Sequence, residues 1–219
     1  MVSAAGFNLE IAPSVVLVYD VSLLPTRSVK RRHRKSSHPF RAAGSLTPEV
    51  DIIVAAGPGS PVAAVTVELL AALGVRRVVT VGVAGWLQGK PPHGHYIVER
   101  AESDEATSHY YGGDLHANQG LTESLVSALA ATTAVALTTD TPFRHTPDRL
   151  ESHRRRASLI EMECAAVFAA ANHFEIRAAS VLVVSDVFHD DGWRRLPSGQ
   201  NSQILQQAVS AAGSVLHSA

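Results

Sequence analysis

Residues 51–61 read DIIVAAGPGSP, and an alanine- and leucine-rich run covering residues 62–73 follows them directly. A short apolar run rich in β-branched residues predicts a strand that is buried on both faces. Glycine and proline then mark a tight turn, and the apolar run after it predicts a buried helix. Strand, glycine turn and helix in this order form the repeating unit of α/β folds, so this stretch decides the fold class.

The same alternation continues on both sides of this stretch. The whole chain has 219 residues and 46% hydrophobic content, which is enough for one sizeable core. We therefore predict a single domain over residues 1–219, an αβα sandwich whose central sheet is mixed and mostly parallel. The further strands are expected at residues 14–18, 77–81, 96–101, 134–137, 160–162 and 178–184, and the further helices at residues 121–131, 147–156, 164–174 and 202–217.

One basic segment interrupts this pattern, at about residues 27–41 (RSVKRRHRKSSHPFR). Its like charges and its lack of an apolar period predict an exposed loop. The whole chain has a net charge of −1, and the basic run at residues 27–35 has no interleaved Phe, Tyr or Trp, so nucleic-acid binding is not expected. With one cysteine and no long apolar span, the sequence favours a soluble cytoplasmic protein that does not bind membranes.

The predicted carboxyl ends of the strands carry the residues best suited to chemistry. Ligands of open α/β sheets bind at that edge. The glycine turns at residues 57–59 and 82–85 fall there, and so does Asp186, which follows the strand at residues 178–184. We therefore expect the functional site along this edge.

Three carboxylates are candidates for that site. Glu161 and Glu163 stand where a predicted strand gives way to a helix, where acids can also simply complement the helix dipole. In a pocket, Glu163 could instead accept two hydrogen bonds from a vicinal diol such as that of ribose. Asp186 is either a turn-forming residue or, if kept protonated in a pocket, a general acid for a leaving group.

Six short motifs follow one another along residues 51–186. They are GPGSP (57–61), VVTVGVAG (78–85), DEATSHY (104–110), TDTPF (139–143), IEMECAA (160–166) and VVSD (183–186). Each motif alone is weak, but in this order and spacing they resemble those of the nucleoside phosphorylase family, which includes purine nucleoside phosphorylases, uridine phosphorylases and methylthioadenosine nucleosidases.

The resemblance implies a role for each matching residue. Met162 would pack under the ribose, Glu163 would hold its 2′ and 3′ hydroxyls, and Phe143 would lie against the base. Asp186 would protonate N7 of a purine. We also count Gly82 and Glu161 among the substrate-binding residues. We expect no organic cofactor, and no metal because the histidines show no paired spacing with cysteine. Inorganic phosphate is a possible co-substrate, and the resemblance implies a homo-oligomer.

Two features leave the base open. Uridine phosphorylases lack the aspartate because pyrimidines have no N7, so Asp186 favours a purine. The segment ATSHY at residues 106–110, in contrast, resembles that of some uridine phosphorylases.

The nucleophile also stays open, because the arginines that bind phosphate in the family are missing. Gly57, Gly59, Thr80 and Val83 occupy the positions of a possible phosphate or nucleophile site, and Asp20 is the nearby acid. We expect nucleoside phosphorolysis, with hydrolysis by water as the alternative. A nucleoside-binding protein that has lost catalysis is the second alternative. The basic segment could supply the missing charge.

Overall fold

The strands of the chain join into one mixed sheet. The computed structural model describes residues 10–23, 40–90, 94–144 and 146–219. Within these residues the sheet has nine strands in the order β2-β3-β1-β4-β7-β6-β5-β8-β9. They are β1 (Ser14–Val18), β2 (Phe40–Thr47), β3 (Val50–Ala55), β4 (Arg77–Trp86), β5 (His95–Asp104), β6 (Thr132–Thr139), β7 (Leu159–Glu161), β8 (Arg177–His189) and β9 (Gly192–Arg195).

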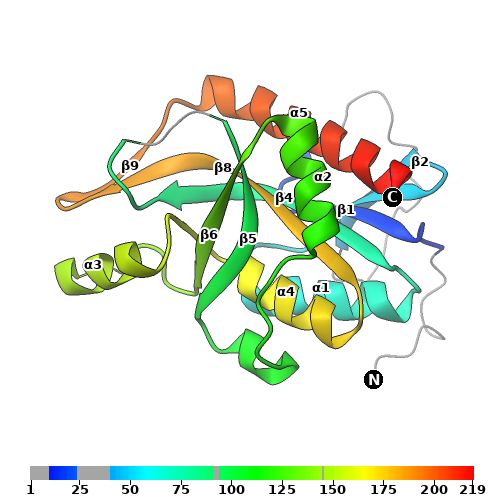
Figure 1. The fold of residues 1–219 in the computed structure, drawn as a ribbon, viewed down its shortest axis with the longest axis horizontal. Coiled ribbons are helices and arrows are strands. Elements are labelled where there is room, and N and C mark those ends of the chain that lie inside the picture. Colours follow the sequence, from blue (N-terminus) through cyan, green and yellow to red (C-terminus); the bar gives the residue numbers. More distant parts are fainter. Residues whose placement is uncertain (1–9, 24–39, 91–93, 145) are drawn as a thin grey trace.

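Helices cover both faces of this sheet, as Figure 1 shows. α1 and α4 pack together on one face, and α2 and α5 pack together on the other. α3 lies beyond the end of the sheet that carries the β8–β9 hairpin. The helices are α1 (Ser60–Ala72), α2 (Gln119–Leu129), α3 (Pro147–Arg156), α4 (Cys164–His173) and α5 (Ser198–Ser218), with short 3-10 helices η2 (Val21–Leu23) and η3 (Thr107–Tyr111).

The predicted layers and the mixed sheet are confirmed, but the sheet is not a simple open one, because part of it closes on itself. β4 pairs with β1, with β7 and with β8, and the pairings β7–β6, β6–β5 and β5–β8 complete a five-stranded ring. β4 is ten residues long, so one strand can serve both the open part and the ring. A register shift between Ala84 and Gly85 lies where β4 enters the ring, and such irregularities bend strands.

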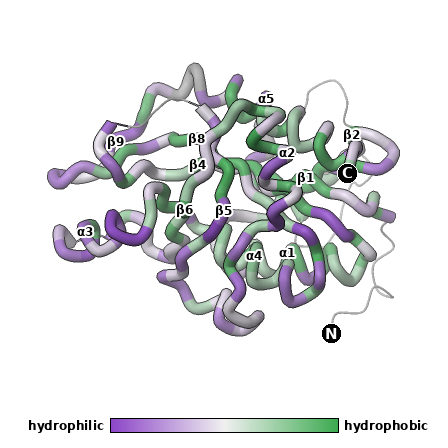
Figure 2. The backbone as a smooth tube through the Cα atoms, viewed as in Figure 1, coloured by the Kyte–Doolittle hydropathy of each residue, from purple (hydrophilic) through white to green (hydrophobic). Residues whose placement is uncertain are grey.

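The buried strands explain the continuous apolar runs of the sequence. Every residue of β1 is buried, with Val15 and Leu17 in the cluster on the α1–α4 side and Val16 and Val18 in the other cluster. Successive side chains of a strand point to opposite faces, so one apolar strand contributes to both cores. Figure 2 shows this apolar interior and, in contrast, a largely hydrophilic α3.

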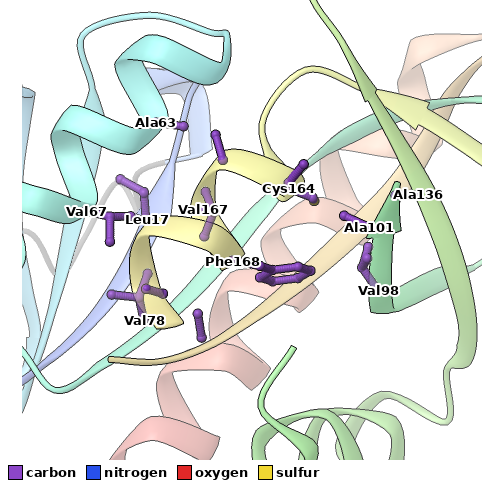
Figure 3. Packing of buried hydrophobic residues seen from close by; sticks show 14 of the residues in the cluster. Leu17, Ala63, Val67, Val78, Val98, Ala101, Ala136, Cys164, Val167 and Phe168 are labelled. Atoms are coloured by element: carbon purple, nitrogen blue, oxygen red, sulfur yellow. The ribbon is translucent and has the colours of Figure 1, made fainter. Parts of the chain in front are cut away.

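α4 is almost entirely enclosed, and its alanines explain how. Residues Cys164–Ala171 are all buried, and Phe168 fills the space between the helix and the sheet. In Figure 3, Phe168 points toward Val98, Ala101 and Ala136, while Val167 faces the side chains of α1 and β1. Alanine has the highest helix propensity and the smallest side chain that keeps a Cβ. α4 can therefore pack closely against both α1 and the sheet.

The sequence reading missed several features of the sheet. β2 was not predicted, and it takes in Phe40 and Arg41, which we had placed in the basic loop; residues 24–39 of that loop lie outside the described residues. β4 and β8 each run five residues past their predicted ends at Val81 and Val184. Residues 82–85 are therefore strand and not a turn. Among the described residues, no helix is long and apolar enough to cross a membrane.

Gly85 shows why a glycine is needed inside β4. An added Cβ would lie 2.3 Å from Cε2 of Phe188 and 2.9 Å from Cγ2 of Ile160. We expect Gly85→Ala to lower the free energy of unfolding by about 1–3 kcal/mol, because an overpacked core must shift its side chains. The control is Gly82→Ala on the same strand, where the new Cβ would have its nearest contact at 3.6 Å. Urea unfolding of both variants measures the difference, and equal stabilities would contradict the packing described here.

Candidate active site

A cavity of about 480 Å³ opens at the carboxyl ends of β1, β4 and β8. This is the edge at which the sequence predicted the site. Its walls include Tyr19 and Asp20 after β1, Met162 and Glu163 after β7, and Asp186 on β8. The cavity therefore brings together the residues that the sequence singled out from distant segments.

The glycine turn after β3 holds the Met162–Glu163 segment in place. The Gly59 backbone N–H donates to Oε1 of Glu163 at 2.7 Å, and the Ser60 hydroxyl donates to the Met162 carbonyl at 2.9 Å. Gly59 has φ +104°, a backbone conformation that side chains other than glycine rarely adopt. The turn is thus needed to orient Glu163, which explains why two motifs about one hundred residues apart occur together.

Glu161 stabilises the start of α4. Its Oε2 accepts hydrogen bonds from the backbone N–H groups of Glu163 at 2.7 Å and Cys164 at 2.8 Å. Its Oε1 accepts from the Thr138 hydroxyl, which in turn accepts from the Ala165 N–H at 2.8 Å. These bonds satisfy N–H groups that a helix leaves unpaired at its first turn. Glu161 lines the cavity, and its contact with a substrate stays a prediction.

The environment of Glu163 favours its protonated form. Burial raises the pKa of Glu163 to about 8, and the charge of Glu161 contributes to the increase. A carboxyl group next to a second buried acid cannot ionise without cost. Hydrogen bonds from a bound diol would favour the ionised form, since they stabilise the carboxylate.

The raised pKa of Glu163 has a consequence for stability. Between its usual pKa near 4.5 and about 8, the folded protein holds a proton that the unfolded chain has released, so stability falls as pH rises through this range. Glu163→Gln removes this titration. We expect its melting temperature, relative to wild type, to rise from pH 5 to pH 8 in thermal unfolding scans. Glu123→Gln, at an exposed position of α2, is the control, and a constant difference for Glu163→Gln would contradict the raised pKa.

Asp186 lies inside β8 and not at the end of a strand, because β8 continues into a hairpin with β9. The Ser185 hydroxyl donates to Oδ2 of Asp186 at 2.5 Å. Asp186 is directly opposite Arg195 on β9, so Arg194 and Arg195 belong to a strand and not to the predicted loop. Directly opposed side chains share a face of the sheet. Asp186 and Arg195 both line the cavity, and no ion pair joins them within the described residues.

Aromatic rings lie on the same side of the cavity as Asp186. Phe188 and Trp193 are opposed on β8 and β9, two residues along from Asp186 and Arg195, and therefore share their face. Phe143, after β6, lies against Trp193 with ring centroids 5.1 Å apart. Phe143 is 63% exposed and Trp193 44%. Exposed rings at a cavity mouth can stack on a planar ligand.

The predicted phosphate positions do not form one cluster. Thr80 is buried inside the sheet, and among the four positions only Val83 contributes to the described cavity wall. The Gly59 N–H is already used by Glu163, and Gly57 lies outside that wall. A phosphate contact at these residues stays a prediction.

Acids outnumber bases among the charged residues of the cavity wall that the structure describes. They are Asp20, Glu161, Glu163 and Asp186, and Arg195 is the basic side chain among the described lining residues. Asp20 accepts a hydrogen bond from the Ser22 N–H at 2.8 Å, which stabilises the turn after β1. Across residues 10–23, 40–90, 94–144 and 146–219, no group of three or more His, Cys, Asp or Glu side chains could hold a metal ion.

Comparison with known proteins agrees with this arrangement. The model of the phosphorylase superfamily matches residues 21–219. The chain belongs to the phosphorylase superfamily. A search of curated proteins found no match to the sequence.

Solved structures show the same fold as this phosphorylase-superfamily chain at low sequence identity. A purine nucleoside phosphorylase from Toxoplasma gondii, in complex with immucillin-H, has a TM-score of 0.81 and 16% identity, with 96% of this chain and 94% of that one covered. An AMP nucleosidase from Bacteroides thetaiotaomicron has a TM-score of 0.76 and 17% identity, with 95% and 91% covered. A putative methylthioadenosine nucleosidase from Weissella paramesenteroides has a TM-score of 0.71 and 19% identity, with 94% and 97% covered.

The sequence reading missed three side chains of this superfamily member's cavity. Tyr19 lines it beside Glu163, and Phe188 and Trp193 line it beside Asp186. Tyr19 follows β1, where we considered only the acid next to it. A tryptophan in the polar run after residue 189 was a usable signal, because an exposed aromatic ring in a loop or hairpin often contacts a ligand.

Proposed function

We propose that this protein cleaves the N-glycosidic bond of a purine nucleoside in the 480 Å³ cavity. The observation that carries the proposal is that Glu163 and Asp186 reach one cavity from separate elements, the start of α4 and the middle of β8. Glu163 is oriented by Gly59, and Asp186 by Ser185. A carboxylate for the ribose diol and an acid for the base are the two groups that this cleavage needs.

The chemistry follows from where charge develops. Breaking the bond between the base and C1′ leaves positive charge on the sugar and negative charge on the base. In this proposal Asp186 donates a proton to N7 and so neutralises the departing base. A positioned general acid accelerates such a step by about 10²- to 10⁴-fold. With the diol bound, the ionised carboxylate of Glu163 lies next to the sugar and stabilises the positive charge.

The aromatic side chains favour binding of a planar base next to Asp186. Phe143 and Trp193 share the cavity mouth with Asp186, and stacking between aromatic rings contributes about 0.5–1.5 kcal/mol beyond the area it buries. Met162, on the segment that carries Glu163, would pack under the ribose, and Gly82 would let the sugar approach β4. In this arrangement the sugar lies toward Glu163 and the base toward the hairpin.

We propose water as the nucleophile. Inorganic phosphate carries up to two negative charges, and a pocket must pair that charge with donors or cations. The described wall near Glu163 supplies Tyr19, Asp20 and Val83, none of which is a cation. Phosphorolysis, expected from the family resemblance, is the second candidate, and the observation that favours it is the basic run at residues 27–35 of the sequence.

A substrate panel tests the leaving group. We expect release of free base from inosine, adenosine, guanosine or methylthioadenosine, and none from uridine, because uridine has no N7 to protonate. Cleavage of uridine at a rate equal to that of the purines would contradict the role of Asp186. Binding of nucleosides without any release of base would instead favour the alternative of a catalytically inactive binding protein.

A further inference from the structure

A second, smaller cavity of about 120 Å³ adjoins the site; we call it the side pocket. Phe143, Phe188 and Trp193 line both the side pocket and the main cavity, so these three rings form the partition between them. On its far side the side pocket is lined by Pro147 and Leu150 of α3. In Figure 1, α3 and the β8–β9 hairpin lie at the same end of the molecule.

The walls of the side pocket suit an apolar group. Leu150 and Phe188 belong to a small buried apolar cluster with Leu87, Leu137 and Ile160. Polar side chains, among them His189, Asp190 and Thr146, also line it. An apolar cavity of about 150 Å³ in another protein is large enough for benzene, so about 120 Å³ suits a slightly smaller group, such as a four-carbon chain.

The register of the hairpin relates the side pocket to one edge of the base. Asp186 and Phe188 are two residues apart on β8 and share a face, so the partition begins next to the general acid of the proposed function. On a purine, N7 and the substituent at position 6 lie on the same edge. A base whose N7 faces Asp186 therefore directs its 6-substituent toward Phe188 and the partition.

We propose that the side pocket is a subsite for an apolar substituent at position 6 of the purine, reached across the partition that Phe143, Phe188 and Trp193 form. This inference rests on the proposed function, because that function fixes the orientation of the base. Phe143 and Trp193, the two exposed rings, have a defined role in this subsite. They stack with the base on one side and cover the substituent on the other.

The test compares dissociation constants of adenosine and N6-butyladenosine, measured by calorimetry, in wild type and two variants. His189→Trp fills the side pocket from a residue that does not line the main cavity. Arg194→Trp adds the same ring to the same hairpin outside both cavities, and is the control. We expect wild type and Arg194→Trp to bind N6-butyladenosine about tenfold more tightly than adenosine, since burying methylene groups is favourable.

His189→Trp is expected to lose this preference while its affinity for adenosine stays within about twofold. Equal affinities of wild type for the two ligands would overturn the side-pocket inference, and so would a preference that His189→Trp retains. Failure of adenosine to bind at all would instead contradict the proposed function. Base release from adenosine, followed in the same samples, shows whether the side-pocket inference or the proposed function has failed.

Discussion

Replacing Asp186 with asparagine is expected to lower kcat for a purine nucleoside by about 10²- to 10⁴-fold while the nucleoside still binds. Asparagine keeps the shape of the side chain and can still accept the Ser185 hydroxyl hydrogen bond, but it has no carboxylic proton to donate. Because the proton is transferred only in the transition state, the loss should appear in kcat more than in KM. Steady-state kinetics of base release measures both constants.

The matched control for this variant is Asp191→Asn. Asp191 lies at the tip of the same hairpin, pairs with Arg194 and lines neither cavity. Its replacement should leave kcat within about twofold, since exposed ion pairs contribute little. An Asp186→Asn enzyme with unchanged kcat would remove the general-acid assignment, although membership of the phosphorylase superfamily would stand.

Replacing Glu163 with glutamine is expected to weaken nucleoside binding by about tenfold to hundredfold and to lower turnover as well. Hydrogen bonds to charged groups contribute about 1.5–3 kcal/mol each, and glutamine loses the charge together with one acceptor oxygen. The Gly59 N–H can still donate to the amide oxygen, so the turn after β3 should keep its geometry. The loss of affinity therefore reflects ribose binding and not a changed geometry of the turn.

Calorimetric titration with a purine nucleoside measures this loss, and Glu123→Gln is again the control. A 2′,3′-dideoxynucleoside provides an independent check, because it lacks the hydroxyls that Glu163 is proposed to hold. It should bind wild type and Glu163→Gln equally weakly. A Glu163→Gln protein with wild-type affinity for the full nucleoside would show that the diol is held elsewhere.

The local elements of the fold were predictable because their signals are local. The strand–glycine turn–helix stretch at residues 51–73 and the polar helix α3 were correct to within a few residues. The five-stranded ring was not predictable, since it depends on β4 finding three partners that lie far apart in the sequence. Nothing in residues 82–85 distinguishes a glycine turn from a strand whose glycine at position 85 makes room for Phe188.

The residues of the site likewise fall into those that the sequence could predict and those that it could not. Asp186 was identified because it follows an apolar run, and Glu163 because it stands where a predicted strand gives way to a helix; both line the cavity. The hydrogen bond from the Gly59 N–H to Glu163 was not foreseen, because it joins residues 104 positions apart in the sequence. Phe188 and Trp193 were missed because their relation to Asp186 arises only from the hairpin register.

The most direct test of the proposed function is a product assay in phosphate-free buffer and again with about 50 mM phosphate, with inosine, adenosine or guanosine as substrate. Cleavage by water predicts free base and free ribose at equal rates in both buffers. A rate that requires phosphate, with ribose 1-phosphate as product, would contradict water as the nucleophile and favour phosphorolysis. No release of base in either buffer would contradict N-glycosidic cleavage itself.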